Sequence, residues 1–125
     1  MLCSIALTYL IGGLLLKNMI ARPRPFQAFP SVSLITEAPE GYSCPSLHTA
    51  IAFACAMTVF LKNKKAGVPC LLFAAVIGFS RLYFFVHYPT DVLLGAVLGA
   101  LCALIVTGLS IDLAGRRLAR RNKQS

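Results

Sequence analysis

The chain has 125 residues, of which 58% are hydrophobic and only 13% are charged, and its mean hydropathy is +0.76. Soluble domains are typically about half apolar and a quarter charged, so this composition excludes an ordinary soluble fold and indicates an integral membrane protein of one domain. The net charge of +8 comes without a surface that combines basic and aromatic residues, so we expect no nucleic-acid binding.

Four apolar stretches are predicted to be membrane helices, and the expected fold class is therefore an all-α helical bundle. The second stretch is shorter than the roughly 20 residues that a span needs. The loop after the first stretch contains Pro23, Pro25, Pro30 and Pro39, which argue against a further span. The predicted spans are residues 2–20, 46–62, 67–87 and 91–114, with an outer loop at 21–45 and a basic tail at 115–125.

The distribution of basic residues predicts the orientation. Lys17 follows the first apolar run instead of preceding it, so we expect a retained helix and not a cleaved signal peptide. Two basic groups lie on one side of the bundle, and the positive-inside rule makes that side, with the C-terminus, cytoplasmic. These groups are Lys62, Lys64 and Lys65, and then Arg116, Arg117, Arg120, Arg121 and Lys123.

Four cations remain on the outer side and require another reason to be there: Lys17, Arg22, Arg24 and Arg81. The cysteines do not provide one. Cys44 stands alone in the outer loop, and the five cysteines have no regular spacing that would indicate disulfides or a zinc site. The sequence predicts no cofactor and no metal.

Polar residues form three clusters at the ends of the apolar stretches, and up-and-down threading brings all three to the outer side. They provide two histidines, one carboxylate and three cations, which is a set suited to phosphoryl transfer. The clusters are Lys17 with Arg24-Pro25, then Pro45-Ser46-Leu47-His48, and then Ser80-Arg81 with His87 and Asp91.

The order and spacing of these clusters resemble the three-part signature of the type 2 phosphatidic acid phosphatase family. The resemblance covers Lys17 to Asp91 and, through the following helix, nearly the whole chain. Two departures are visible. Leu47 stands where the family more often has Gly, and the membrane members of the family commonly have six helices, so the first two are expected to be missing here.

The residues and the resemblance agree on the catalytic roles. His87 is the expected nucleophile, with Asp91 holding the proton on its other ring nitrogen. His48 is expected to protonate the leaving oxygen and later to activate water. The expected phosphate ligands are Lys17, Arg24, Arg81, the Ser46 hydroxyl and the backbone amide of Leu47, supported by Pro25, Pro45 and Ser80.

Structural readings of the same residues stay open. Lys17 alone is more often a snorkelling residue at a helix end, Ser46 is as plausible a helix N-cap as a phosphate donor, and Ser80 is as suited to a structural hydrogen bond as to substrate contact. Arg22 matches no position of the signature and is left unassigned. Two histidines and a carboxylate among three cations make a poor site for a divalent metal.

Two further patterns concern architecture. Gly95 and Gly99, extended by Ala96, Ala100 and Ala103, predict a small-residue face that lets the last helix approach its neighbours. Aromatic residues near the outer interface are typical of an aromatic belt or of a lining for a lipid tail. These are Tyr83, Phe84, Phe85 and Tyr88.

We therefore expect a metal-independent phosphatase in the cytoplasmic membrane, with its active site on the outer side and a phosphohistidine intermediate. Among the substrates that the resemblance implies, undecaprenyl diphosphate is favoured because the compact chain resembles bacterial members. Phosphatidic acid and phosphatidylglycerol phosphate are the alternatives. The rival class of function is a non-catalytic truncated paralogue or assembly partner, motivated by the missing helices.

Overall fold

A computed structural model of the chain describes residues 1–122, and within that range it contains helices and no strand. The prediction of an all-α membrane protein is confirmed. The first helix is continuous and comprises α1 (Leu2–Thr8), a π-helical stretch η1 (Tyr9–Leu16) and α2 (Lys17–Ile20). The remaining helices are α3 (Pro25–Ala28), α4 (Leu47–Lys62), α5 (Lys64–Tyr83) and α6 (Pro89–Asn122).

Three segments are long and apolar enough to cross a membrane: Leu2–Ala28, Lys64–Tyr83 and Pro89–Ala114. The helix α4 has 16 residues, which corresponds to about 24 Å at 1.5 Å per residue and is shorter than a hydrocarbon core of about 30 Å. The expectation of about four spans is thus met by three long helices and one short helix.

The boundaries of the later helices differ from those predicted. The third span was expected at 67–87, but α5 begins at Lys64, where the Asn63 side chain accepts a hydrogen bond from the Ala66 amide. It ends at Tyr83, because the chain turns and Phe85 adopts a left-handed conformation with φ of 57°. Residues 84–87 therefore form a turn. The predicted tail at 115–125 is helical as far as Asn122.

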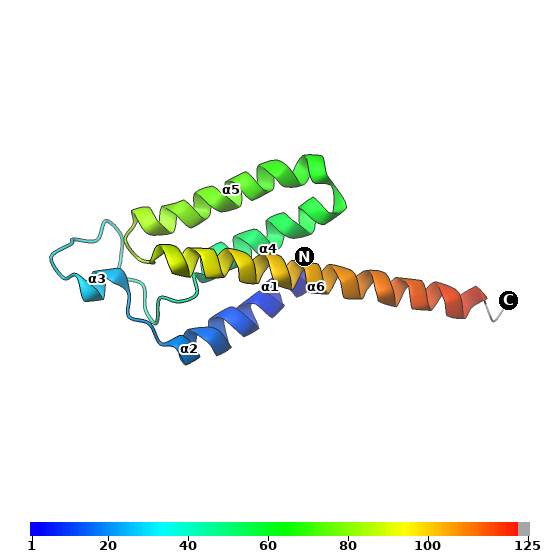
Figure 1. The fold of residues 1–125 in the computed structure, drawn as a ribbon, viewed down its shortest axis with the longest axis horizontal. Coiled ribbons are helices and arrows are strands. Elements are labelled where there is room, and N and C mark those ends of the chain that lie inside the picture. The colour runs from blue at the N-terminus through cyan, green and yellow to red at the C-terminus, as the bar shows by residue number, and fades with distance from the viewer. Residues whose placement is uncertain (123–125) are drawn as a thin grey trace.

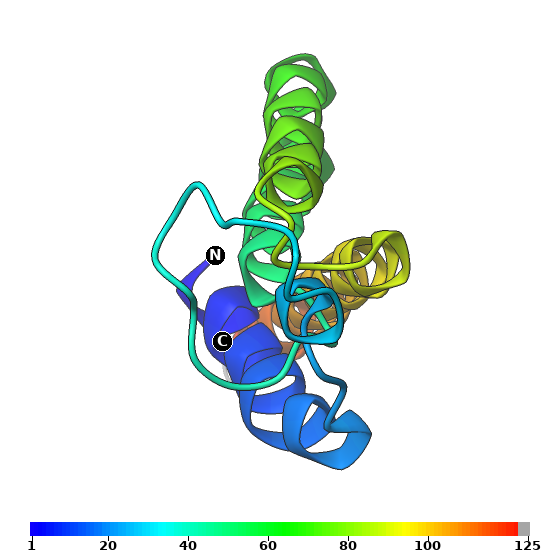
Figure 2. The same cartoon turned by 90° about the vertical axis from the view of Figure 1, so that its left-hand side faces the viewer.

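Helix α4 lies at the centre of the bundle, between α5, α6 and the first helix (Figures 1 and 2). The predicted small-residue face of α6 produces its close approach to α4. A Cβ atom added at Gly99 would lie 2.0 Å from the Ala50 carbonyl oxygen, and one at Gly95 would lie 2.5 Å from that of Ser46. Only glycine permits this backbone contact, which brings the start of α4 against the second and third turns of α6.

Large apolar side chains lie on the outside of the bundle, whereas small and polar side chains fill its interior. Leu72 and Val76 of α5 and Leu93 of α6 are exposed, while Thr8, Thr58 and Ala54 are buried. This is the distribution expected when the surrounding solvent is hydrocarbon and helices associate through small residues.

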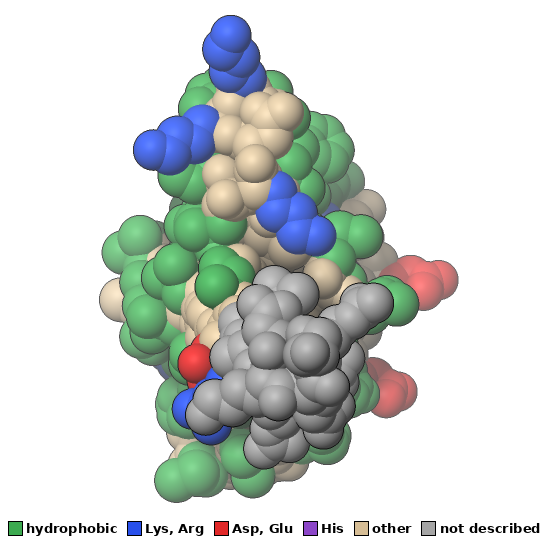
Figure 3. All heavy atoms as spheres, turned by 90° about the vertical axis from the view of Figure 1, so that its right-hand side faces the viewer, with side chains coloured by type: hydrophobic (Ala, Val, Ile, Leu, Met, Phe, Trp, Pro, Cys, Tyr) green, Lys and Arg blue, Asp and Glu red, His purple; other side chains and the backbone are tan. Residues whose placement is uncertain are grey.

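The two ends of the bundle differ in character. The α5–α6 turn and the long loop before α4 lie at one end, on the left in Figure 1, together with the start of α4 and of α6. At the other end, lysine side chains gather at the α4–α5 turn above a hydrophobic body (Figure 3), where Lys62, Lys64 and Lys65 are exposed. The bundle thus separates a basic end from the end that contains the signature residues.

Candidate active site

The three polar clusters meet at the loop end of the bundle. Lys17 begins α2, His48 lies in the first turn of α4, Arg81 lies in the last turn of α5, and Asp91 lies in the first turn of α6. Their segments surround the same end of the bundle when it is viewed along its length (Figure 2). Up-and-down threading therefore brings together residues that are far apart in the sequence.

Two of the cations, Lys17 and Arg81, each lie about one helical turn from a glycine that packs against the start of α4. A Cβ at Gly13 would lie 3.4 Å from Leu47 Cδ2, and Lys17 follows Gly13 by about one helical turn. On the opposite side, a Cβ at Gly78 would lie 3.4 Å from Thr49 Cγ2, and Arg81 follows one turn later. The two cations thus flank the turn of α4 that contains His48.

Asp91 is completely buried, and its carboxylate is surrounded by hydrogen-bond donors. Oδ1 accepts a hydrogen bond from Arg22 Nη1 at 2.9 Å. Oδ2 accepts hydrogen bonds from the Tyr88 amide at 2.9 Å and from the Ser43 hydroxyl. A buried charge requires such partners, and together they hold the carboxylate in one orientation with Oδ2 towards His87.

His87 lies in the turn before α6 with only 6% of its surface exposed. Its Nδ1 atom is 3.8 Å from Asp91 Oδ2 and 3.5 Å from Ser43 Oγ, so Nε2 is the ring nitrogen away from the carboxylate. Burial and the charge of Arg24 lower the pKa of His87 to about 4, although Asp91 acts in the opposite direction. The imidazole is therefore neutral at neutral pH and has a lone pair available for attack.

Arg24 is only 3% exposed, and its guanidinium connects the outer loop to the turn before His87. Nε donates to the Gly41 carbonyl at 2.9 Å, Nη2 to the Glu40 carbonyl at 3.0 Å and Nη1 to the Val86 carbonyl at 3.2 Å. A guanidinium has five N–H groups, so two remain for a phosphate oxygen. Arg24 thus holds the loop and the turn together and also contributes a positive charge to the site.

The N-terminus of α4 presents unpaired backbone donors. The Ser46 amide donates to the Asp91 carbonyl at 3.0 Å. In the described part of the chain, the amides of Leu47 and His48 have no hydrogen-bond partner, as is normal for the first turn of a helix and suitable for an anion. The Ser46 hydroxyl is buried 3.0 Å from the Thr49 hydroxyl and does not cap the helix. His48 itself is exposed.

Arg81 borders a pocket of about 390 Å³ together with Glu37, Phe84 and Val86, the residue that precedes His87 in the chain. Arg81 Nε donates to the Ser80 hydroxyl at 3.2 Å, and Ser80 in turn donates to the Ile77 carbonyl at 2.7 Å. Ser80 thus makes a structural hydrogen bond. Within residues 1–122, neither Lys17 nor Arg81 forms an ion pair, so both charges are available to a ligand.

The two supporting prolines are buried. Pro25 occupies the first position of α3, directly after Arg24. A Cβ added at Gly12 would lie 3.8 Å from Pro45 Cγ, so Pro45 packs against the first helix. Both prolines therefore stabilise the chain on either side of the site.

Sequence reasoning did not identify Ser43 and left Arg22 unassigned, yet both contact Asp91. The Ser43 amide also donates to the Arg22 carbonyl at 2.8 Å, and the Arg22 guanidinium carbon lies 3.8 Å from the centre of the Tyr88 ring. One signal was available for Arg22, because the sequence predicted it to be a cation on the outer side, where the positive-inside rule disfavours basic residues. No such signal marked Ser43.

In the described part of the chain, no group of three or more His, Cys, Asp or Glu side chains is placed to hold a metal ion. Lys17, Arg24 and Arg81 lie close enough to His48 for their charges to act on it, and Arg22 pairs with the Asp91 carboxylate beside His87. This arrangement can bind an anion and present an imidazole lone pair to it.

Comparison with known sequences identifies related proteins. A family model described as the PAP2 superfamily matches residues 1–112. The bacitracin transport permease protein BcrC of Bacillus licheniformis is 38% identical over 96 residues, which cover 77% of this chain and 47% of that protein. The undecaprenyl-diphosphatase BcrC of Bacillus subtilis is 37% identical over 102 residues, which cover 78% and 50%. The chain thus spans about half the length of these curated relatives.

Solved structures show the same arrangement of helices. LpxE of Aquifex aeolicus is 32% identical with a TM-score of 0.72, and the match covers 83% of this chain and 62% of that one. A transmembrane PAP2-type phosphatidylglycerolphosphate phosphatase of Bacillus subtilis is 26% identical with a TM-score of 0.75, covering 89% and 57%. These neighbours agree with a multi-pass membrane protein.

Proposed function

This chain belongs to the PAP2 superfamily, and on that premise we propose that it hydrolyses a lipid phosphate through a phosphohistidine intermediate. The observation that carries the proposal is the geometry of His87. Its Nδ1 faces a buried carboxylate at 3.8 Å, and its Nε2 is the ring nitrogen away from that carboxylate. The cations Lys17, Arg24 and Arg81 lie near the second histidine, His48.

In the first step, Nε2 of neutral His87 attacks phosphorus, and the bond from phosphorus to the leaving oxygen breaks. The imidazole becomes cationic, and the fixed carboxylate of Asp91 stabilises that charge. For a lipid diphosphate the leaving group is the lipid monophosphate. The exposed His48 lies one residue from the unpaired Leu47 amide, and we assign it the proton that the leaving oxygen needs.

In the second step, His48 takes a proton from water, and the resulting hydroxide attacks the phosphohistidine. The bond between phosphorus and Nε2 breaks, which releases inorganic phosphate and restores neutral His87. Lys17, Arg81 and the two free N–H groups of Arg24 stabilise the negative charge on the equatorial oxygens. The amides of Leu47 and His48 add donors at the positive end of α4.

The favoured substrate is undecaprenyl diphosphate. The support is the similarity to the undecaprenyl-diphosphatase of Bacillus subtilis, which is 37% identical over the matched residues. The similarity of the fold to a phosphatidylglycerolphosphate phosphatase supports a second class of substrate, the phosphatidic acid and phosphatidylglycerol phosphate group.

We further propose that the site lies on the outer side of the cytoplasmic membrane. The exposed lysines Lys62, Lys64 and Lys65 lie at the end of the bundle opposite the site, where the positive-inside rule predicts the cytoplasm. The last helix then brings the C-terminus to the same cytoplasmic side. Released phosphate would appear outside the cell.

Phosphate release by the purified protein in lipid nanodiscs tests the proposal. We expect release from undecaprenyl diphosphate that exceeds release from phosphatidic acid, persists in EDTA and is absent from the His87→Ala variant. Acid-labile, base-stable phosphate should be trapped on the wild-type chain and not on this variant. A chain that binds the lipid but releases no phosphate would instead support the non-catalytic reading.

A further inference from the structure

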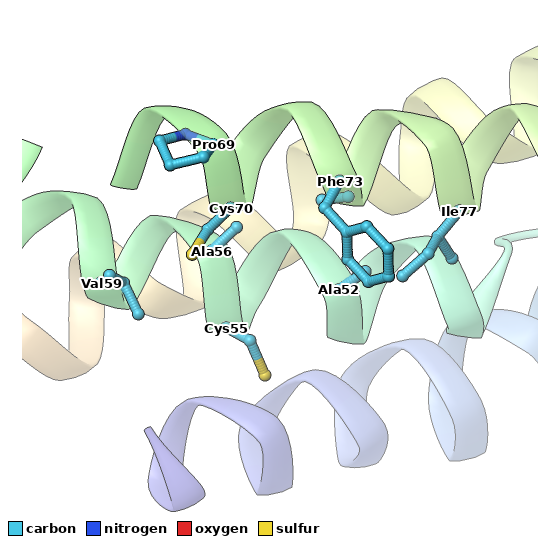
Figure 4. Close-up of a pocket in the computed structure, with 9 residues that line it drawn as sticks. Ala52, Cys55, Ala56, Val59, Pro69, Cys70, Phe73 and Ile77 are labelled. Atoms are coloured by element: carbon cyan, nitrogen blue, oxygen red, sulfur yellow. The ribbon is translucent and has the colours of Figure 1, made fainter. Parts of the chain in front are cut away.

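An apolar groove of about 510 Å³ runs between α4 and α5 (Figure 4). Its lining consists entirely of apolar side chains from the two helices, so it offers no partner for a charged or strongly polar ligand. The lining residues include Ala52, Ala56 and Val59 of α4 and Cys70, Phe73 and Ile77 of α5.

The groove begins directly below the candidate active site. Ala52 follows His48 by four residues on α4, and Ile77 precedes Arg81 by four residues on α5. Residues four apart lie on the same face of a helix, so the outer end of the groove lies one turn below both functional side chains. Figure 4 shows Ala52 and Ile77 together at that end.

The length of the groove follows from the helix rise. Val59 lies eleven residues after His48, which corresponds to about 16 Å at 1.5 Å per residue. The groove thus reaches about halfway through a hydrocarbon core of about 30 Å. A long lipid tail would occupy it only with the part nearest to its phosphate.

The groove is open to the membrane along one side. Phe73 is 67% exposed and Cys70 and Ile77 are half-buried, whereas Ala56 on the floor is buried. The floor consists of small side chains and the rim of larger ones, so a hydrocarbon chain can enter from the bilayer and contact both helices.

We propose that this groove binds the head-proximal part of the hydrocarbon tail of the lipid phosphate. The inference rests on the function proposed above, which places the phosphate beside His48 and Arg81 and so directs the attached tail to the groove opening. The substrate class is therefore an amphiphile whose tail descends between α4 and α5 while its phosphate stays at the outer end of these helices.

Photolabelling tests the location of the tail without requiring turnover. One probe is an isoprenoid diphosphate with a diazirine close to the phosphate end of the tail, and a second carries the diazirine at the far end. The matched control is the isoprenoid alcohol of the first probe, which lacks the diphosphate. We expect the first probe to label residues 52–59 and 70–77 at least fivefold more than either of the others. Equal labelling by the alcohol, or labelling elsewhere, would overturn the proposal.

Groove-filling variants provide the second test. Ala52→Phe and Cys70→Phe should each raise the KM for a long-tailed lipid diphosphate about tenfold and leave a short-tailed, water-soluble one unchanged. Leu72→Phe is the matched control, since Leu72 is exposed on α5 and does not line the groove. Unchanged KM values in both folded groove variants would contradict the proposal.

The two proposals can fail separately. If the first probe labels the groove of the wild type and of His87→Ala equally, and the wild type releases no phosphate, the hydrolytic function is refuted and the tail site is retained. Normal hydrolysis without groove labelling would refute the tail site alone.

Discussion

Arg22 donates a hydrogen bond from Nη1 to Oδ1 of Asp91 at 2.9 Å across 69 positions of the sequence. The same nitrogen lies 2.7 Å from the Thr90 hydroxyl, and the guanidinium stacks on the Tyr88 ring. Arg22 thus attaches the chain after the first helix to the start of α6 and turns the other carboxylate oxygen, Oδ2, towards His87. A residue outside the signature therefore positions a residue inside it.

Replacing Arg22 should loosen Asp91. We expect Arg22→Ala to lower kcat about tenfold and to reduce stability by about 1–2 kcal/mol, because a buried carboxylate loses a charged donor that is itself partly solvent-screened. Arg22→Lys keeps the charge but loses the stacking on Tyr88, so its kcat and its stability should lie between those of the wild type and of Arg22→Ala. Phosphate release and thermal unfolding in detergent measure both effects. An Arg22→Ala protein with unchanged kcat would show that Arg22 is only a structural tether.

Asp91→Asn should cost more activity than its small change in shape suggests. Arg22, Ser43 and the Tyr88 amide all donate to this carboxylate, so an amide NH₂ group would face a donor at one of the two oxygen positions. We expect kcat to fall by about 10²–10⁴, as when an imidazole loses its orienting carboxylate. The measurement is single-turnover phosphate release at saturating lipid. A loss below threefold would contradict a role for Asp91 in orienting His87.

The low pKa of His87 makes stability depend on pH. Its folded-state pKa of about 4 lies below the ordinary value of 6.5, so the unfolded chain binds the proton more readily. The stabilisation is complete above pH 6.5, is lost as the pH falls towards 4 and amounts to on the order of 1–3 kcal/mol. Unfolding temperatures between pH 7 and pH 4 should therefore fall more steeply for the wild type than for His87→Gln. Parallel curves would show that His87 does not titrate in this way.

The contact between α4 and α6 should tolerate no side chain at Gly99. A Cβ there would meet the Ala50 carbonyl oxygen at 2.0 Å, so Gly99→Ala should reduce stability by about 1–3 kcal/mol or separate the helices and lower activity. Gly108→Ala on the same helix is the matched control, because nothing lies within 4 Å of its added Cβ. Equal stability of the two variants would contradict the observed packing.

Thiol labelling can determine the orientation, but Cys44 is unsuitable for it. This cysteine is in the predicted outer loop, yet it is only 3% exposed, and burial raises the pKa of its thiol, so it should react slowly. An exposed Ser33→Cys should react with an impermeant maleimide added to intact cells, whereas an exposed Lys64→Cys should be protected. The opposite pattern would place the site in the cytoplasm.

Sequence reasoning was sufficient for the fold class, and the polar clusters that it selected as a candidate site lie at one end of the bundle. The cost of placing polar groups in hydrocarbon is large enough that apolar runs alone indicate membrane helices. The spacing of Lys17, Arg24, His48, Arg81, His87 and Asp91 along those helices then predicts which residues meet. The small-residue face at Gly95 and Gly99 was also predictable, because close packing of membrane helices requires small side chains at helical spacing.

Only the tertiary structure showed how the outer loop folds back over the site. The path of residues 21–45 depends on contacts with distant carbonyl and carboxylate groups, which no local pattern of residues encodes. Those contacts bury Arg24 and add Ser43 and Arg22 to Asp91. The left-handed conformation of Phe85 likewise ends α5 at Tyr83 instead of at His87. Hydrogen bonds between residues 40 to 70 positions apart are decided by the packing of the whole bundle, so the sequence could predict candidate reacting groups but not the residues that hold Asp91 in place.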